Sequence, residues 1–266
     1  MIAKDSRAVG FWFIVNAMNK SNVVLVTGSA GRVGQTVVGE LTARGQAVRG
    51  FDLVPTPGVG DSVVGNIADT EVCARACAGA HTLVHLAATP DDDDFMSRLL
   101  PDNIVGFYNI MEAARLAGVR RLILPSSGQV SWWRALAGPW PIHPDAPVAP
   151  KYWYAATKMF MESIGRSYAE MHGQSVIVVR LGWCPRTRAQ VAEIAASEWA
   201  QDVYLSPGDS GRFFACAVEA AEELKFAIVY ATSQPMHILR YDLEPTKRLL
   251  GFAPQERWPQ GIEIVK

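Results

Sequence analysis

Residues 23–34 read VVLVTGSAGRVG, an unbroken apolar run followed at once by three spaced glycines. A run of this kind, without polar alternation, is typical of a strand buried on both faces of a parallel sheet. In the turn, Gly28 permits a tight bend, Gly31 allows the backbone to approach a pyrophosphate, and Gly34 lets the next helix pack on the strand. The N-terminus of that helix attracts phosphate. The stretch therefore predicts the first strand, turn and helix of a dinucleotide-binding unit.

Strands and helices alternate along the rest of the chain. The apolar pattern predicts helices over 33–44, 72–78, 103–117 and 155–172, and further strands over 47–52, 81–86, 121–124 and 175–180. Such alternation implies a parallel sheet with right-handed crossovers. We expect an α/β, Rossmann-type doubly wound parallel sheet with helices on both faces and a small C-terminal substrate lobe.

Asp52 closes the second predicted strand, where a carboxylate can accept hydrogen bonds from both adenosine ribose hydroxyls and would repel a 2′-phosphate. It therefore favours NAD over NADP. Two alternatives stay open. Asp52 could be only a turn residue, since Asp-Leu-Val-Pro also suits a turn, and Arg32 could bind the 2′-phosphate of NADP. Two further groups of residues complete the expected cofactor surface. Asn66 and Ile67 can cover the adenine, while the small or apolar Leu86, Ala87 and Ala88 let the cofactor lie against the backbone.

Residues 23–266 are expected to form a single NAD-binding Rossmann domain. Substrate-lobe insertions interrupt it at about 131–152, 182–205 and 233–266, and the first two follow the carboxyl ends of strands, where doubly wound sheets bind ligands. Segment 131–152 is rich in Trp and Pro and is expected to lack regular structure. Its tryptophans either stack on a ligand or fill the lobe. Residues 1–22 are interpreted as a dispensable extension or as the result of a start codon assigned too early.

Composition excludes several partners. The formal net charge of −1 gives no broad basic face for nucleic acid and no polybasic stretch for a membrane surface. The apolar stretch 8–15 is too short to span a bilayer, and we expect a cytoplasmic protein. The run Asp91–Asp94 is interpreted as a solvated loop. No metal site is expected, and the cysteines are predicted to be buried free thiols; they are Cys73, Cys77, Cys184 and Cys216.

Tyr154 and Lys158 form a YxxxK pair on a predicted helix, where residues four apart share one face. A nearby ammonium favours the phenolate, so Lys158 is expected to lower the Tyr154 pKa toward the range of a general base. Ser126 and Ser127 end the preceding strand and offer hydroxyls that can hold a substrate oxygen. His85, by contrast, is interpreted as a packed or hydrogen-bonded histidine.

The ordered set TGSAGRVG, Asp52, HLAA, Asn103, Ser126-Ser127 and YAATK resembles the extended short-chain dehydrogenases, the NAD-dependent epimerase/dehydratase family, over residues 23–255. The resemblance implies the catalytic residues Ser127, Tyr154 and Lys158. It implies an NAD site formed by Gly28, Ala30, Gly31, Arg32, Val33, Gly34, Asp52, Asn66, Ile67, Leu86, Ala87, Ala88, Asn103, Tyr154, Lys158 and Leu181. It implies substrate contacts from Thr89, Ser126, Ser127, Gly128, Gln129, Trp183 and Arg188.

Within the family the chain is most similar to the uronate dehydrogenase branch, which includes sugar-1-dehydrogenases. It departs from that branch on the substrate side. Gly128-Gln129 replace an Asn-His pair, Trp183 replaces a small serine, and the segment 185–203 is longer. The resemblance implies hydride transfer between NAD and a small sugar or sugar acid. Arg186 and Arg188 are candidates to bind a substrate carboxylate, although both could equally be exposed loop residues.

Two other functions stay open. A nucleotide-sugar epimerase or dehydratase would retain its NAD, although the short C-terminal region leaves little chain to hold a nucleotide diphosphate. A non-catalytic NAD-binding sensor would keep the glycine turn and lose the catalytic residues. The expected partner is a small carbohydrate, and the resemblance implies a homodimer formed through the helices 103–117 and 155–172.

Overall fold

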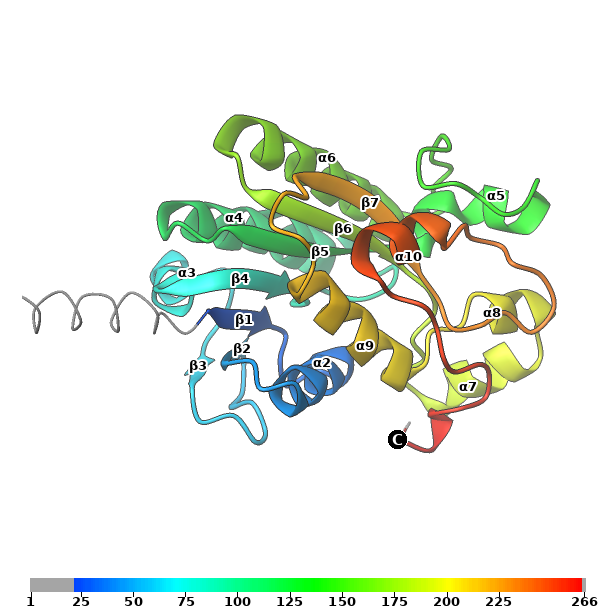
Figure 1. The fold of residues 1–266 in the computed structure, drawn as a ribbon, viewed down its shortest axis with the longest axis horizontal. Helices are drawn as coiled ribbons and strands as arrows, with labels where there is room; N and C mark the ends of the chain where they lie inside the picture. The colour runs from blue at the N-terminus through cyan, green and yellow to red at the C-terminus, as the bar shows by residue number, and fades with distance from the viewer. Residues whose placement is uncertain (1–21, 265–266) are drawn as a thin grey trace, which may run out of the picture.

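Strand β1 (Val23–Thr27) pairs in parallel with a strand on either side, and the pairing continues outward to seven strands in the order β3-β2-β1-β4-β5-β6-β7. The structure is a computed structural model that describes residues 22–264 (Figure 1). The other strands are β2 (Val48–Asp52), β3 (Ser62–Val64), β4 (Ala80–His85), β5 (Arg121–Ser127), β6 (Ser175–Leu181) and β7 (Phe226–Ala231). All neighbouring strands run parallel, which confirms the predicted fold class.

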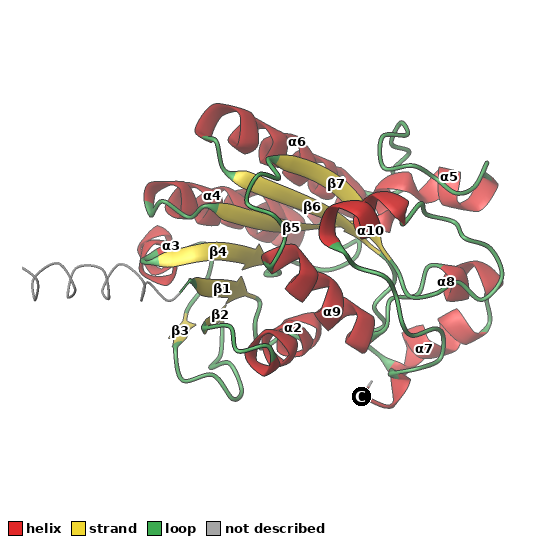
Figure 2. Cartoon of the chain, viewed as in Figure 1, coloured by secondary structure: helices red, strands yellow, loops and turns green. Residues whose placement is uncertain are grey.

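Helices cover both faces of the sheet (Figure 2). On one face α3 (Thr70–Cys77), α4 (Phe107–Leu116) and α6 (Trp153–His172) enclose a core that includes Leu83 and Leu122. On the other face α2 (Arg32–Ala43) packs beside α9 (Pro207–Val218). Strand β5 is buried along its whole length, as expected for a strand between two helical layers.

The predicted strands and helices are all present, with shifts of a few residues at their ends. The helix predicted over 103–117 begins earlier, because the π-helix η1 (Phe95–Gly106) precedes α4 and contains Pro101. The prediction that 131–152 lacks regular structure is wrong in part. After the 3-10 turn η2 (Gly128–Ser131), Trp132–Ala137 form α5, which buries Ala135 and ends at Gly138 with a φ of 77°.

The substrate lobe lies over the carboxyl ends of the strands and contains more regular structure than the sequence suggested. Its elements are α5, α7 (Arg188–Ala195), α8 (Glu198–Asp202), α10 (Glu244–Leu250) and η3 (Ile262–Ile264). Aromatic residues form its two small cores, and the rings of Tyr230 and Tyr241 stack with centroids 4.3 Å apart. Segments far apart in sequence are joined in the lobe where Ile142 forms a parallel bridge with Tyr241.

The cysteines, the helix lengths and the N-terminal residues can each be compared with the sequence-based expectations. Cys73 and Cys77 are buried free thiols as predicted, whereas Cys184 and Cys216 are only half-buried. Within residues 22–264, no helix combines the length and apolar character needed to cross a membrane. The same residues contain no cluster of three or more His, Cys, Asp or Glu side chains suited to a metal ion. The predicted extension, residues 1–22, falls outside the described residues apart from Asn22.

Candidate active site

The turn between β1 and α2 can only be built from glycine at two positions. Gly28 has a φ of 65°, and a Cβ atom there would lie 2.7 Å from the Ala87 backbone nitrogen. A Cβ on Gly34 would lie 2.1 Å from the Gly28 carbonyl oxygen. Gly31 is the N-cap residue of α2, and no side chain among the described residues caps this helix. The first N–H groups of α2 therefore stay available to an anion. These features fit a dinucleotide pyrophosphate.

Asp52 lies at the end of β2, where its carboxylate is held by the backbone. Oδ2 accepts a hydrogen bond from the Ala30 nitrogen at 2.9 Å, and Oδ1 accepts one from the Leu53 nitrogen at 2.6 Å. Both contacts leave lone pairs on the carboxylate free. Asp52 therefore presents a fixed negative charge beside the glycine turn, where an adenosine ribose fits and a 2′-phosphate is disfavoured.

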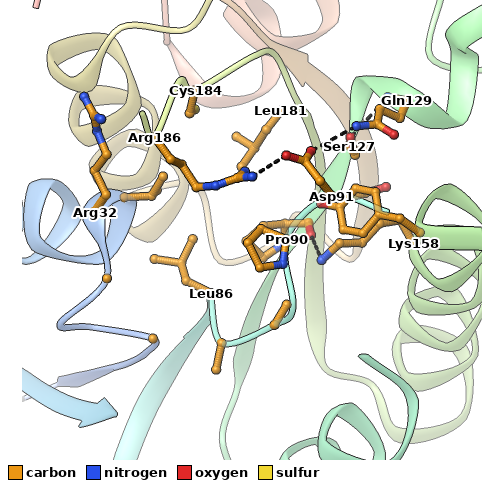
Figure 3. A pocket seen from close by; sticks show the side chains of 18 of the residues that line it. Arg32, Leu86, Pro90, Asp91, Ser127, Gln129, Lys158, Leu181, Cys184 and Arg186 are labelled. Carbon is orange, nitrogen blue, oxygen red and sulfur yellow. Dashed lines mark hydrogen bonds and ion pairs between the residues drawn. The ribbon is translucent and has the colours of Figure 1, made fainter. Parts of the chain in front are cut away.

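Arg32 faces a different direction. Burial lowers its pKa, and the groups that act on it next are Cys184, Tyr204 and Arg186, all from the lobe. Figure 3 shows its side chain on the Cys184 and Arg186 side of the cavity. The guanidinium thus lies toward the lobe in this structure, and the alternative in which it binds a ribose phosphate stays open.

A single cavity of about 860 Å³ joins the glycine turn to the predicted catalytic residues. Its volume is in the range of sites that enclose small ligands. The predicted cofactor residues that line it are Gly28, Gly31, Arg32, Val33, Gly34, Asp52, Asn66, Ile67, Leu86, Ala87, Ala88, Tyr154, Lys158 and Leu181.

Two predicted cofactor residues lie outside this lining. Ala30 acts through its backbone on Asp52. Asn103 is buried behind the cavity, where its amide donates to the Thr89 carbonyl at 3.1 Å and to the Thr157 hydroxyl at 3.2 Å. The Thr89 backbone nitrogen in turn donates a hydrogen bond to the Asn103 Oδ1 at 2.8 Å. This pair therefore ties the loop after β4 to helix α6, and neither side chain belongs to the lining of the cavity.

The three predicted catalytic residues meet at the other end of the cavity. Ser127 ends β5, and Tyr154 and Lys158 occupy the first two turns of α6. The Lys158 ammonium donates to the Pro125 carbonyl at 3.1 Å and lies 5.5 Å from the centre of the Tyr154 ring. The Tyr154 nitrogen donates to Asp92 at 3.1 Å, which anchors the start of the helix.

The electrostatics of Tyr154 differ from the sequence-based expectation. Burial and then the charge of Asp91 raise its pKa, while the charge of Arg186 and hydrogen bonding with Ser127 lower it. Burial also lowers the pKa of Lys158 to about 8. The expected net lowering of the Tyr154 pKa is therefore wrong here, because desolvation of the phenolate outweighs the nearby positive charge.

His85 matches its interpretation as a packed histidine. It is 2% exposed, shares a 2.9 Å hydrogen bond with the Thr27 hydroxyl and lies against the Phe107 ring. Burial and the Lys158 charge lower its pKa to about 3. A buried imidazole with a pKa this low stays neutral near pH 7 and packs beneath the cavity.

Of the predicted substrate residues, Ser126, Ser127, Gly128, Gln129 and Trp183 line the cavity, whereas Thr89 and Arg188 do not. The Ser126 hydroxyl donates to Glu162 at 2.6 Å and so belongs to a supporting network. A Cβ on Gly128 would lie 2.7 Å from the hydroxyl of Tyr241, which itself lines the cavity. Glycine at this position therefore admits Tyr241 from the C-terminal segment.

The acidic run after β4 is not simply a solvated loop. Asp91 and Asp92 line the cavity, and Asp91 pairs with Arg186 across it. Asp94 caps η1, with its carboxylate accepting from Ser97. Figure 3 shows Asp91 between Arg186 and Gln129. The interpretation as a solvated loop holds for the exposed Asp92, Asp93 and Asp94 and is wrong for Asp91, which pairs with Arg186 at the cavity.

The tryptophans of segment 131–153 divide between the two roles considered. Trp132 lines the cavity and packs edge-on against Trp199, with ring centres 4.7 Å apart. Trp140 fills the lobe. Trp133 and Trp153 are exposed. Cavity-lining residues that sequence reasoning did not assign include Asp91, Trp132, Gln190, Glu193, Trp199 and Tyr241; only the concentration of aromatic residues in the insertions signalled any of them.

Comparisons with known proteins identify the family to which this chain is similar. A family model described as the NAD dependent epimerase/dehydratase family matches residues 24–183. An L-arabinose 1-dehydrogenase (NAD(P)(+)) of Haloferax volcanii is 30% identical over 90% of this chain and 99% of its own length. A uronate dehydrogenase of Agrobacterium fabrum is 32% identical over 60% of this chain and 61% of its own.

Solved structures show the same likeness. The structure of a glucuronic acid dehydrogenase from Chromohalobacter salexigens superposes with a TM-score of 0.75 at 25% identity, covering 92% of this chain and 88% of that chain. A mutated uronate dehydrogenase superposes with a TM-score of 0.72 at 26% identity, covering 92% of this chain and 85% of that chain.

Proposed function

Because this chain belongs to the NAD-dependent epimerase/dehydratase family, we propose that it oxidises a carbinol carbon of a small sugar or sugar acid with NAD. The resemblance inferred from the sequence motifs is confirmed by the family match. The observation that carries the proposal is one cavity that holds the glycine turn and Asp52 at one end and Ser127, Tyr154 and Lys158 at the other. A dinucleotide and a small substrate would meet end to end in it.

The proposed reaction removes a hydride and a proton from one carbinol group. NAD bound in this cavity would supply the hydride acceptor. Ser127 orients the substrate hydroxyl, and the phenolate form of Tyr154 accepts its proton to become the neutral phenol as the carbonyl forms. Because burial and Asp91 favour the neutral phenol, the proton transfer depends on positive charge nearby, which Arg186 and Lys158 provide. Lys158 is also proposed to bind the nicotinamide ribose.

The NAD preference rests on Asp52. Its carboxylate lines the adenosine end of the cavity and is fixed by two backbone donors. A 2′-phosphate at that position would meet this charge at close range. A relative of this chain is named for use of NAD(P)(+), so family membership alone does not select the cofactor, and the proposed preference rests on Asp52.

A substrate screen tests the proposal. The full chain is incubated with NAD and a panel of aldoses, uronates, nucleotide sugars and simple alcohols, and NADH formation is followed at 340 nm. Turnover with a free sugar or sugar acid is the expected result. Conversion of a nucleotide sugar without net NADH formation would instead support a retained-NAD epimerase or dehydratase. NAD binding without turnover on any substrate would favour a sensor.

The proposed assembly is a cytoplasmic homodimer. Large apolar side chains are exposed along η1, α4 and α6, which lie on one side of the sheet; they are Val105, Tyr108, Leu116, Phe160 and Met171. A second copy packed there would remove these side chains from water. Light scattering coupled to size exclusion tests the dimer, and Tyr108→Arg is expected to shift it toward monomer.

A further inference from the structure

Asp91 has an unusual backbone conformation at the substrate end of the cavity. Its φ of 62° is the only positive value at a non-glycine residue in the described part of the chain. A residue in this region carries a backbone strain of about 1–3 kcal/mol unless its surroundings fix it, and such strain often accompanies binding sites. The loop is therefore held in this shape by contacts of the Asp91 side chain.

Three side chains from elsewhere hold the Asp91 carboxylate. Gln129 donates to Oδ1 at 3.2 Å, Gln190 donates to Oδ2 at 3.2 Å, and Arg186 forms an ion pair with Oδ2. A carboxylate offers about four acceptor positions, so one position on Oδ1 stays open. Asp91 lines the cavity and raises the pKa of Tyr154, which places its charge near the reacting group.

The charges around the substrate end are predominantly negative. The cations in the lining are Arg32, Lys158 and Arg186. Lys158 stands beside Tyr154, and the guanidinium groups of Arg32 and Arg186 both lie on the lobe side of the cavity. Of these two, Arg186 is the cation that pairs with Asp91, so its charge is already matched. The lining carboxylates near this end are Asp91, Asp92, Asp102 and Glu193.

We propose that Asp91 determines substrate class at this site, so that an uncharged free aldose is accepted and an anionic uronate or sugar phosphate is rejected. The proposal rests on the proposed sugar oxidation and makes it more specific. The open acceptor position of Asp91 receives a sugar hydroxyl, while its charge neutralises Arg186. A uronate carboxylate would have to displace Asp91 from Arg186 and lie next to the displaced charge. Discrimination thus comes from repulsion as well as from attraction.

The test compares matched sugars in the wild type and in Asp91→Asn. Glucose with glucuronate, and galactose with galacturonate, differ only at carbon 6. In the wild type, kcat/KM for the aldose is expected to exceed that for the uronate at least tenfold. Asparagine tolerates a positive φ, so Asp91→Asn leaves the backbone conformation allowed while it removes the charge and the ion pair with Arg186. The aldose-to-uronate ratio is expected to fall at least tenfold, chiefly through a lower KM for the uronate.

Asp93→Asn is the matched control, because Asp93 belongs to the same loop but has a half-exposed side chain and does not line the cavity. The aldose-to-uronate ratio of kcat/KM in Asp93→Asn is expected to equal that of the wild type. Two results would overturn this inference and leave the proposed sugar oxidation standing. They are a wild type that prefers the uronate, and an Asp91→Asn variant in which kcat/KM for the aldose and for the uronate fall equally. Absence of NADH formation with every sugar would overturn the proposed function and, with it, this inference.

Discussion

The guanidinium of Arg180 and the carboxylate of Glu162 form two parallel hydrogen bonds inside the protein, Nε to Oε1 at 2.9 Å and Nη2 to Oε2 at 2.8 Å. Their side chains are 3% and 8% exposed. Glu162 lies one turn beyond Lys158 on α6 and also accepts from Ser126, while Arg180 donates to the Pro144 carbonyl at 2.9 Å. The pair therefore fixes the catalytic helix, two strand ends and the substrate lobe relative to one another.

Removing Glu162 alone should lower the free energy of unfolding far more than removing Glu162 and Arg180 together. Glu162→Leu leaves the Arg180 charge buried and unpaired, and we expect it to lower the free energy of unfolding by about 3–5 kcal/mol. In Glu162→Leu/Arg180→Met the buried charge is gone, so more than half of the loss should return. Urea unfolding measures both variants. A double variant as unstable as the single one would show that the charge is not the cause.

Tyr154→Phe removes the phenolic oxygen that is proposed to accept the substrate proton and leaves the ring. Since general base catalysis contributes about 10²–10⁴-fold, kcat should fall by at least about 10². NAD affinity, measured by quenching of protein fluorescence, should stay close to that of the wild type. Tyr108→Phe on the exposed face of α4 is the control and should leave kcat unchanged. Normal turnover by Tyr154→Phe would refute the proposed mechanism.

Asp52→Asn keeps an oxygen acceptor for the Ala30 nitrogen but removes the negative charge. The kcat/KM ratio of NAD to NADP is expected to fall at least tenfold, which corresponds to about 1.4 kcal/mol of lost discrimination. Steady-state kinetics with each cofactor gives the ratio. Asp61→Asn, at an exposed residue paired with Arg49, should not change it. An unchanged ratio in Asp52→Asn would mean that other groups set the preference.

His85 should make the fold sensitive to mild acid. Its pKa is about 3 in the folded protein against an ordinary value of 6.5, so the unfolded chain binds more protons between these values. Stability therefore falls as pH decreases from 6.5 toward 3, and the contribution of His85 is about 2 kcal/mol smaller at pH 5 than at pH 7.

The comparison of His85→Gln with the wild type isolates this effect. Although the substitution destabilises the protein at pH 7, the difference in unfolding free energy between pH 7 and pH 5 should be about 2 kcal/mol smaller than in the wild type. His143→Gln, at a half-exposed position, should keep the wild-type difference. An equal pH dependence in all three proteins would contradict the assignment to His85.

Much of the cofactor end was predictable from the sequence because its determinants are local. The run at 23–27 and Gly28 and Gly34 act within a dozen residues, and their steric requirements hold in any chain that forms this turn. The YxxxK spacing on a helix has the same local character. The substrate end was less predictable, since insertions with irregular patterns form it and α5 was missed for that reason.

The sequence by itself determined the parallel Rossmann sheet and the glycine turn followed by Asp52, and its resemblance to a family indicated Ser127, Tyr154 and Lys158 as the proposed catalytic residues. Only the tertiary structure decided that Asp91 meets Arg186, 95 residues away, and that the Tyr241 hydroxyl donates to the Gly128 carbonyl across 113 residues. The physical reason is that contacts between loops depend on how the whole sheet brings strand ends together. Burial then sets the Tyr154 pKa, a quantity that no local pattern contains.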